Sequence, residues 1–149
     1  QELERRAGTV NVSGVASLSA ALDEQQKNML EQNQKILKER TDFETKIKHY
    51  LNVMIVGESV ERLPHISNIQ FNAIHSETLM VALDLQGLGV SRGSACASGA
   101  QRPSHVLEAM KISNDKINSH LRFSFGWNTK IGDGVKAAGI VLSTIEGMK

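Results

Sequence analysis

The chain has 149 residues, of which 40% are hydrophobic and 22% are charged, so it has the size and composition of one ordinary globular domain. That excludes a disordered tail or a fibrous repeat. With 17 basic and 16 acidic residues the net charge is +1, which gives no electrostatic case for nucleic acid or an anionic membrane as a partner. A single cysteine excludes an intrachain disulfide and a cysteine-based zinc site. The sequence shows no membrane span and no signal peptide at its start, and we expect a cytoplasmic protein.

The first residue is Gln1 and not Met, and we expect the chain to be cut from a longer one. Residues 12–51 predict one long amphipathic helix without proline. Apolar side chains recur there every seven residues, at Val15, Leu22, Met29, Ile36, Phe43 and Tyr50. The pattern fits a coiled-coil seam or a helix that connects two parts of a larger protein. Gln25 and Gln32 interrupt the second apolar row and weaken the coiled-coil interpretation.

Short strands and helices alternate through the rest of the chain. We expect strands at 52–56, 66–71, 88–90 and 121–125, and helices from Ser76, from Pro103 and over 131–145, with Ser76 and Ser113 as helix caps. Residues 91–102 are small or polar and predict a loop. The expected fold class is α+β, in which a long connecting helix precedes a small mixed or antiparallel sheet covered by helices.

Cys96 lies in the predicted loop between glycines and other small residues, where a buried structural cysteine is not expected. Arg92 lies close to it in the sequence and could favour the reactive thiolate. An inert thiol in a turn is the alternative, and the loop alone does not say which thiol chemistry is used.

Arg122 interrupts an otherwise apolar strand, between Leu121 and Phe123. A guanidinium at such a position needs a partner, because burying it unpaired is costly. Its planar donor pattern matches a carboxylate. An internal salt bridge or an exposed arginine would explain the residue equally well.

The segment 5–9 ends in Gly8 and Thr9 just before the long helix, and could bind an anion such as phosphate. Ordinary helix capping is the simpler interpretation. The five histidines show no metal-ligand spacing, and we predict no metal site.

Five segments resemble the C-terminal part of a cysteine desulfurase, a class V member of the fold-type I pyridoxal-phosphate enzymes. Residues 1–11 resemble that family's QERGxRxGTxN stretch, and residues 63–71 (LPHISNIQF) resemble its LPNTLNISF strand. Residues 90–98 (VSRGSACAS) resemble its VSSGSACTS loop, and 103–110 and 121–126 resemble its PSxVLxAMG and IRFSLG segments. The resemblance covers almost the whole chain, and the cysteine loop is its most specific part.

The resemblance implies a role for each candidate residue. Cys96 matches the cysteine that attacks the substrate's sulfur and becomes a persulfide. Arg122 matches the arginine that binds the substrate's carboxylate. Thr9 matches a threonine that reaches the cofactor phosphate of the partner in a homodimer.

The chain also departs from the family at four positions. Leu3 and Glu4 stand where the family usually has Arg and Gly, which could alter the lining on the dimer side. Arg92 stands in place of Ser and could tune the thiol or the docking of its loop. Lys111 stands in place of the glycine that follows AMG.

The resemblance further implies a division into the end of a cofactor-domain segment (1–11), a connecting helix (12–51) and a small C-terminal domain (52–149) with the cysteine loop at 91–102. The family's cofactor lysine and ring-stacking histidine match no segment here, so we expect this chain alone to be inactive. The whole protein is expected to use pyridoxal phosphate and to take sulfur from L-cysteine with release of L-alanine. Its expected partners are a second copy and a sulfur acceptor, with iron–sulfur cluster assembly as one destination.

Two other functions stay open. A selenocysteine lyase or another class V enzyme would use a similar loop. A dimeric module with a redox-active thiol would be no enzyme, but it would have no need of Arg122 on its strand.

Overall fold

The computed structural model describes residues 7–93 and 104–148, without the side chains of 114 and 115. The chain forms two compact units, Gln1–Gln32 and Asn33–Lys149. The boundary falls inside the long helix α1 (Val12–Tyr50), whose bounds agree closely with the predicted 12–51. The divisions after 11 and 51 implied by the resemblance remain predictions.

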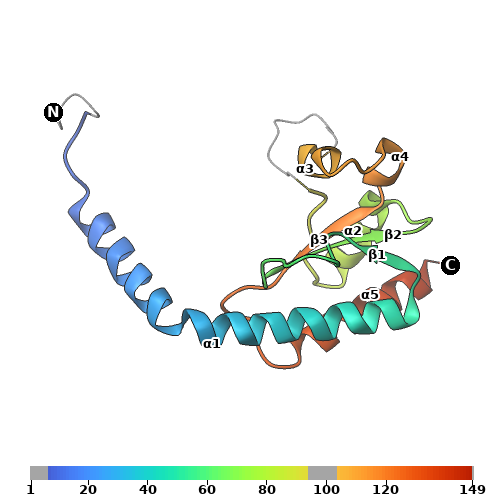
Figure 1. Ribbon diagram of the computed structural model, residues 1–149, viewed down its shortest axis with the longest axis horizontal. Helices are drawn as coiled ribbons and strands as arrows, with labels where there is room; N and C mark the ends of the chain where they lie inside the picture. Colours follow the sequence, from blue (N-terminus) through green and yellow to red (C-terminus); the bar gives the residue numbers. More distant parts are fainter. Residues whose placement is uncertain (1–6, 94–103, 149) are drawn as a thin grey trace. The chain divides into compact units, whose positions relative to one another are not determined.

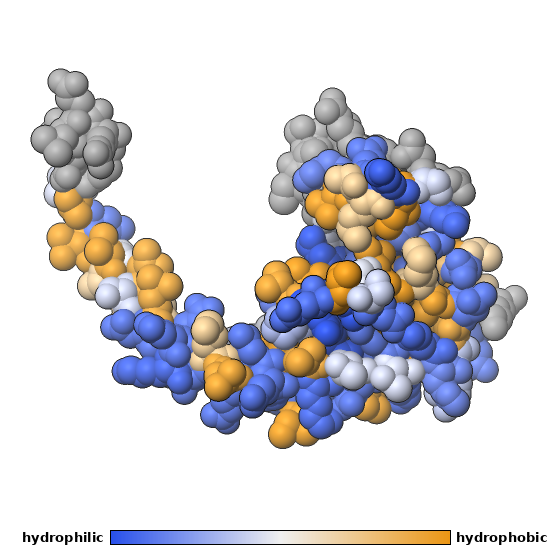
Figure 2. All heavy atoms as spheres, in the orientation of Figure 1, coloured by the Kyte–Doolittle hydropathy of each residue, from blue (hydrophilic) through white to orange (hydrophobic). Residues whose placement is uncertain are grey.

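The first unit is the N-terminal part of α1 and the segment before it. Asn11 begins the helix, since its side-chain oxygen accepts a hydrogen bond of 2.9 Å from the backbone N–H of Gly14. The apolar side chains of Val12, Val15, Leu18 and Leu22 are all exposed (Figure 2). The predicted seven-residue row is therefore uncovered in this unit.

In the second unit the same helix is packed. Its buried side chains are Ile36, Glu39, Arg40, Phe43, Glu44 and Ile47. They lie at positions i, i+3, i+4, i+7, i+8 and i+11, a stripe wider than the two-row seam of a coiled coil and typical of one helix face packed on a flat layer. Tyr50, the last member of the seven-residue row, is exposed. The coiled-coil interpretation is therefore not needed for residues 33–50.

The sheet of the second unit has three antiparallel strands in the order β1-β2-β3 (Figure 1). The strands are β1 (Val53–Ile55), β2 (Ile66–Phe71) and β3 (His120–Ser124). Ile69 of β2 lies opposite Ile55 of β1 and Leu121 of β3. The expectation of a small sheet is confirmed, with the antiparallel alternative correct. The predicted strand at 88–90 is wrong: only the next residue, Ser91, makes a single bridge, to Arg122.

Helices lie on both sides of this sheet (Figure 1). They are α2 (Ser76–Leu85), α3 (His105–Ala109), α4 (Asn114–Ile117) and α5 (Asp133–Gly147). The N-cap of α2 is His75 and not the predicted Ser76, while Ser113 is the N-cap of α4 as predicted. Pro103 lies outside the described residues.

The core lies between the sheet, the second half of α1 and α5. Phe43 of α1 contacts Phe123 of β3 with ring centroids 4.8 Å apart, and Phe125 at 5.7 Å. In α5 the buried apolar residues are Ala138, Val141 and Ile145. The predicted helix start at Ile131 is wrong, because α5 begins at Asp133 and leaves Ile131 exposed.

Candidate functional site

Arg122 occupies the middle of β3, on the face of the sheet opposite the core. Side chains alternate along a strand, and its neighbours Leu121 and Phe123 are both buried in the core. The side chain of Arg122 is half-buried on the other face. Its placement therefore follows from the alternation seen in the sequence.

The sheet places two polar residues directly beside Arg122. Asn68 of β2 lies opposite it on one side, and Ser91 on the other. Directly opposite residues of antiparallel strands share a face. Asn68, Arg122 and Ser91 thus form a polar row across the sheet, which we call the arginine row.

Backbone hydrogen bonds fix the spacing within the arginine row. Ser91 and Arg122 exchange both bonds, at 3.1 Å from the N–H of Ser91 and 2.7 Å from the N–H of Arg122. The backbone polar groups of Arg122 thus point away from Asn68. Asn68 and Arg122 therefore form a non-hydrogen-bonded pair of the antiparallel ladder. In such a pair the Cα atoms are about 4.5 Å apart and the side chains lie closer together than in a hydrogen-bonded pair.

The guanidinium of Arg122 has no ion pair or side-chain hydrogen bond within the part of the chain that the structure describes. The internal salt bridge considered above is thus not found among these residues. The Oδ1 atom of Asn68 is likewise buried without a described partner. A half-buried cation with unused donors can receive a carboxylate or another planar anion.

A second polar pair, Gln70 and His120, continues the same face one pair along the strands. The Nδ1 atom of His120 lies 2.8 Å from the backbone carbonyl of Lys116. Burial lowers the pKa of His120 below its ordinary value, and the contact with Lys116 only partly opposes this. His120 is therefore a neutral imidazole near pH 7. Sequence reasoning missed Asn68 and His120, although the alternation of Asn68 and Gln70 within β2 was a usable signal.

The segment that leads into the cysteine loop is attached at two points. Ser91 is paired to Arg122, and Arg92 donates from Nε to the hydroxyl of Ser76 at 3.0 Å. Arg92 also forms an ion pair with Glu77 at 3.2 Å. These contacts hold Arg92 on α2, so its effect on the Cys96 thiol remains a prediction. Cys96 lies outside the described residues.

Thr9 lies in the first unit, exposed in the irregular segment just before α1. Gly8 beside it has a φ of +94°, a conformation that favours glycine, and a Cβ there would meet open space. The hydroxyl of Thr9 is exposed and could therefore donate a hydrogen bond to a phosphate oxygen. The role of Thr9 remains a prediction.

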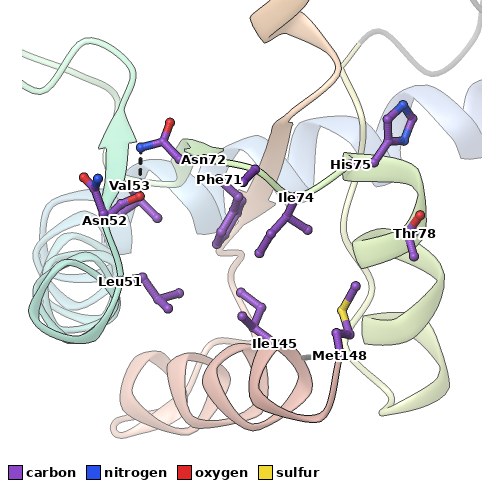
Figure 3. A pocket seen from close by; sticks show the side chains of 11 residues that line it. Leu51, Asn52, Val53, Phe71, Asn72, Ile74, His75, Thr78, Ile145 and Met148 are labelled. Atoms are coloured by element: carbon purple, nitrogen blue, oxygen red, sulfur yellow. Dashed lines mark hydrogen bonds between the residues drawn. The ribbon is translucent and has the colours of Figure 1, made fainter.

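A cavity of about 620 Å³ lies elsewhere, where the end of α1, the end of α5 and the start of α2 approach one another (Figure 3). Phe71, Ile74, Ile145 and Met148 give it an apolar lining, and His75 is its one ionisable residue. Of the described residues no lysine or arginine lines it, so these residues place no permanent positive charge beside it. Arg122 is not among its lining residues.

Two other features, a metal site and a membrane-spanning helix, are absent from the described residues. Within residues 7–93 and 104–148, no three His, Cys, Asp or Glu side chains gather closely enough to hold a metal ion. No helix in the described ranges is long and apolar enough to cross a membrane.

Comparison with known proteins decides the family. The model of the aminotransferase class-V family matches residues 1–135. The chain belongs to this family. Members of the class-V family use pyridoxal phosphate.

Relatives of this chain in the class-V family include cysteine desulfurases. A putative cysteine desulfurase IscS 1 of Bacillus subtilis is 38% identical over 128 residues, which are 85% of this chain and 34% of the relative. The cysteine desulfurase NifS of Azotobacter vinelandii is 34% identical over 125 residues, 83% of this chain and 31% of the relative. The chain thus spans about a third of the length of these relatives.

A solved structure agrees. The NifS-like protein from Rickettsia africae has a TM-score of 0.82 and 28% identity, over 98% of this chain and 38% of that protein. The resemblance to cysteine desulfurases and the α+β fold are therefore confirmed.

Proposed function

We propose that the whole protein is a cysteine desulfurase, which takes sulfur from L-cysteine as a persulfide on Cys96 and releases L-alanine. The observation that carries the proposal is the guanidinium of Arg122, which has no partner among the described residues and is held beside Ser91 at the start of the cysteine loop. The similarity to cysteine desulfurases supports the same assignment.

Arg122 binds the carboxylate of the substrate in this proposal. The strand fixes its backbone on both sides, so the side chain starts from a defined position. Two parallel N–H···O bonds orient the amino acid as well as hold it. Orientation lowers the entropic cost of bringing the substrate sulfur to the attacking group.

Cys96 is the nucleophile. Its thiolate attacks the substrate sulfur, the new S–S bond forms as the Cβ–S bond breaks, and the sulfur stays on Cys96 as a persulfide. The electron pair of the broken bond remains with the carbon fragment, which takes up a proton and becomes L-alanine. Pyridoxal phosphate, when bound, supplies the electron sink that weakens the Cβ–S bond.

The first unit contributes the cofactor contact and an interface. Thr9 binds a phosphate oxygen of the cofactor held by the partner in a homodimer. The exposed apolar row from Val12 to Leu22 provides surface for the rest of the protein to cover. The persulfide passes to an acceptor protein, which fits a role in iron–sulfur cluster assembly in the cytoplasm.

The decisive experiment uses the protein expressed from its complete gene and loaded with cofactor. The parent should release alanine from L-cysteine and carry a persulfide on Cys96, detected by mass spectrometry. Cys96→Ser should still change the cofactor absorbance when cysteine is added, but its alanine release should fall by orders of magnitude because a hydroxyl cannot form a persulfide.

Each alternative predicts a different result. A selenocysteine lyase would release alanine from selenocysteine and hardly from cysteine. A redox-active thiol module would release none from either. Alanine release by Cys96→Ser at the parent rate, without added thiol, would rule out Cys96 as the sulfur acceptor.

A further inference from the structure

The arginine row contains an acceptor that the proposed mechanism does not use. Asn68 is half-buried in β2, and its Oδ1 is buried with no hydrogen-bond donor among the described residues. Leaving a buried acceptor unpaired costs free energy, so such an atom calls for a partner.

Arg122 is the donor best placed to be that partner. It lies directly opposite Asn68, in the pair type that brings side chains closest. A guanidinium has five N–H donors, and none of them is used within the described chain. A carboxylate takes two of them, which leaves others to be fixed by the protein.

Ser91, the other neighbour of Arg122 in the row, already forms a side-chain hydrogen bond. The hydroxyl of Ser91 donates to the backbone carbonyl of Gly93 at 3.2 Å, in the segment that leads into the cysteine loop. Of the side-chain polar atoms of these two neighbours of Arg122, the Oδ1 of Asn68 is the one that is buried with no described partner.

We propose that Asn68 is a positioning residue for Arg122: its Oδ1 accepts one guanidinium N–H and so sets the plane in which the remaining donors meet the carboxylate of the substrate. The inference rests on the proposed function, in that Arg122 is the carboxylate-binding group. An unpositioned guanidinium would still attract the carboxylate, but would hold the amino acid in more than one orientation.

The test compares Asn68→Ala and Asn68→Asp in the complete, cofactor-loaded protein. Asn68→Ala should raise KM and the calorimetric Kd for L-cysteine about tenfold, the loss of one hydrogen bond to a charged group, with a smaller change in kcat. Asn68→Asp should raise them more, on the order of a hundredfold, because its carboxylate pairs with Arg122 and competes with the substrate.

The larger effect of Asp than of Ala on the Kd for L-cysteine distinguishes a positioning role of Asn68 from a structural one. Asp has nearly the shape of Asn, so a residue that only fills the sheet would tolerate Asp better than Ala. Binding of cysteamine, which lacks the carboxylate, should change less than twofold in both variants. In an Arg122→Ala background, Asn68→Ala should have no further effect on the Kd for L-cysteine.

Gln70→Ala is the matched control. Gln70 lies on the same strand and the same face and is more deeply buried than Asn68, but it opposes His120 and not Arg122. Its KM for L-cysteine should stay within twofold of the parent.

Three outcomes would overturn the role of Asn68: a Kd for L-cysteine unchanged in both variants, a larger effect of Ala than of Asp, or an equal loss of cysteamine binding. A parent that binds L-cysteine and releases no alanine would overturn the proposed function instead, while the order of the Kd values would still decide on Asn68.

Discussion

The carboxylate of Glu39 in α1 accepts a hydrogen bond of 2.9 Å from the backbone N–H of Gly134, in the first turn of α5. The N–H of Gly132 donates to both oxygens of the same carboxylate at 3.1 Å. Glu39 is fully buried, and it satisfies backbone donors that the start of a helix otherwise leaves without partners. The two helices are thereby joined across the core of the second unit.

Gly134→Ala should destabilise this unit by about 3 kcal/mol or more. A Cβ on Gly134 would lie 2.0 Å from the backbone oxygen of Glu39, so the two helices would have to separate. Gly139→Ala in the same helix is the control, since its Cβ would meet only the Nζ atom of Lys46 at 3.9 Å. That variant should be about 0.5–1 kcal/mol more stable than the parent. Urea denaturation measures both, and equal midpoints for the two variants would contradict the close approach.

Arg62→Met should destabilise the protein in a pH-dependent way. Arg62 donates to both oxygens of the buried Glu44, at 2.8 and 2.9 Å. Burial alone would raise the pKa of Glu44, but the hydrogen bonds from Arg62 and the charges of Arg62 and Arg40 outweigh it, so the pKa lies below the ordinary 4.5. A lowered pKa contributes stability that is present above pH 4.5 and is lost as the pH falls through the folded-state value.

At pH 7 the Arg62→Met variant should lose about 2–3 kcal/mol, less than a fully unpaired buried charge because Arg40 remains beside Glu44. The difference from the parent should shrink as the pH falls below 4.5 and through the folded-state pKa of Glu44, because Glu44 then becomes neutral in both proteins. Urea titrations at several pH values measure this. A difference that does not change with pH would assign the effect to packing and not to charge.

Lys111→Gly should stabilise the protein by about 0.5–1 kcal/mol. Lys111 has a φ of +59°, in the left-handed region, and follows the end of α3. The N–H groups of Lys111 and Ile112 bond back to the carbonyls of Glu108 and Leu107, the pattern in which glycine is preferred. Lys111→Ala keeps the strain and should bring no comparable gain. A loss of stability in the glycine variant would mean that the lysine side chain compensates.

Arg122→Lys should lower kcat/KM for L-cysteine in the complete protein, although the charge is kept. The expected loss of transition-state stabilisation is about 1.5–3 kcal/mol. An ammonium is a point charge, and cannot form the two parallel bonds that a guanidinium offers. Steady-state alanine release, measured against cysteine concentration, tests this. An unchanged kcat/KM would mean that Arg122 does not hold the carboxylate.

Elements whose signals are local could be predicted from the amino-acid sequence. Strand β2 has the predicted bounds, Ile66–Phe71, because β-branched residues, alternation and a preceding proline act within a few residues. The long helix and the core-facing alternation around Arg122 followed in the same way. The short bridge at Ser91 was misread as a strand at 88–90, since a single pairing leaves no periodic pattern.

Which of these residues lie together depends on how the elements pack, and local patterns do not predict it. The seven-residue row of α1 is the same in both units, yet Val15 and Leu22 are exposed while Ile36 and Phe43 are buried. Nothing local distinguishes them, because burial depends on what packs against each turn. The pairing of Asn68 with Arg122 depends on the register between strands far apart in the sequence, which the packing of the whole core fixes. The sequence therefore predicts single candidate residues of the site, such as Arg122, but their proximity to one another follows from the pairing of the strands.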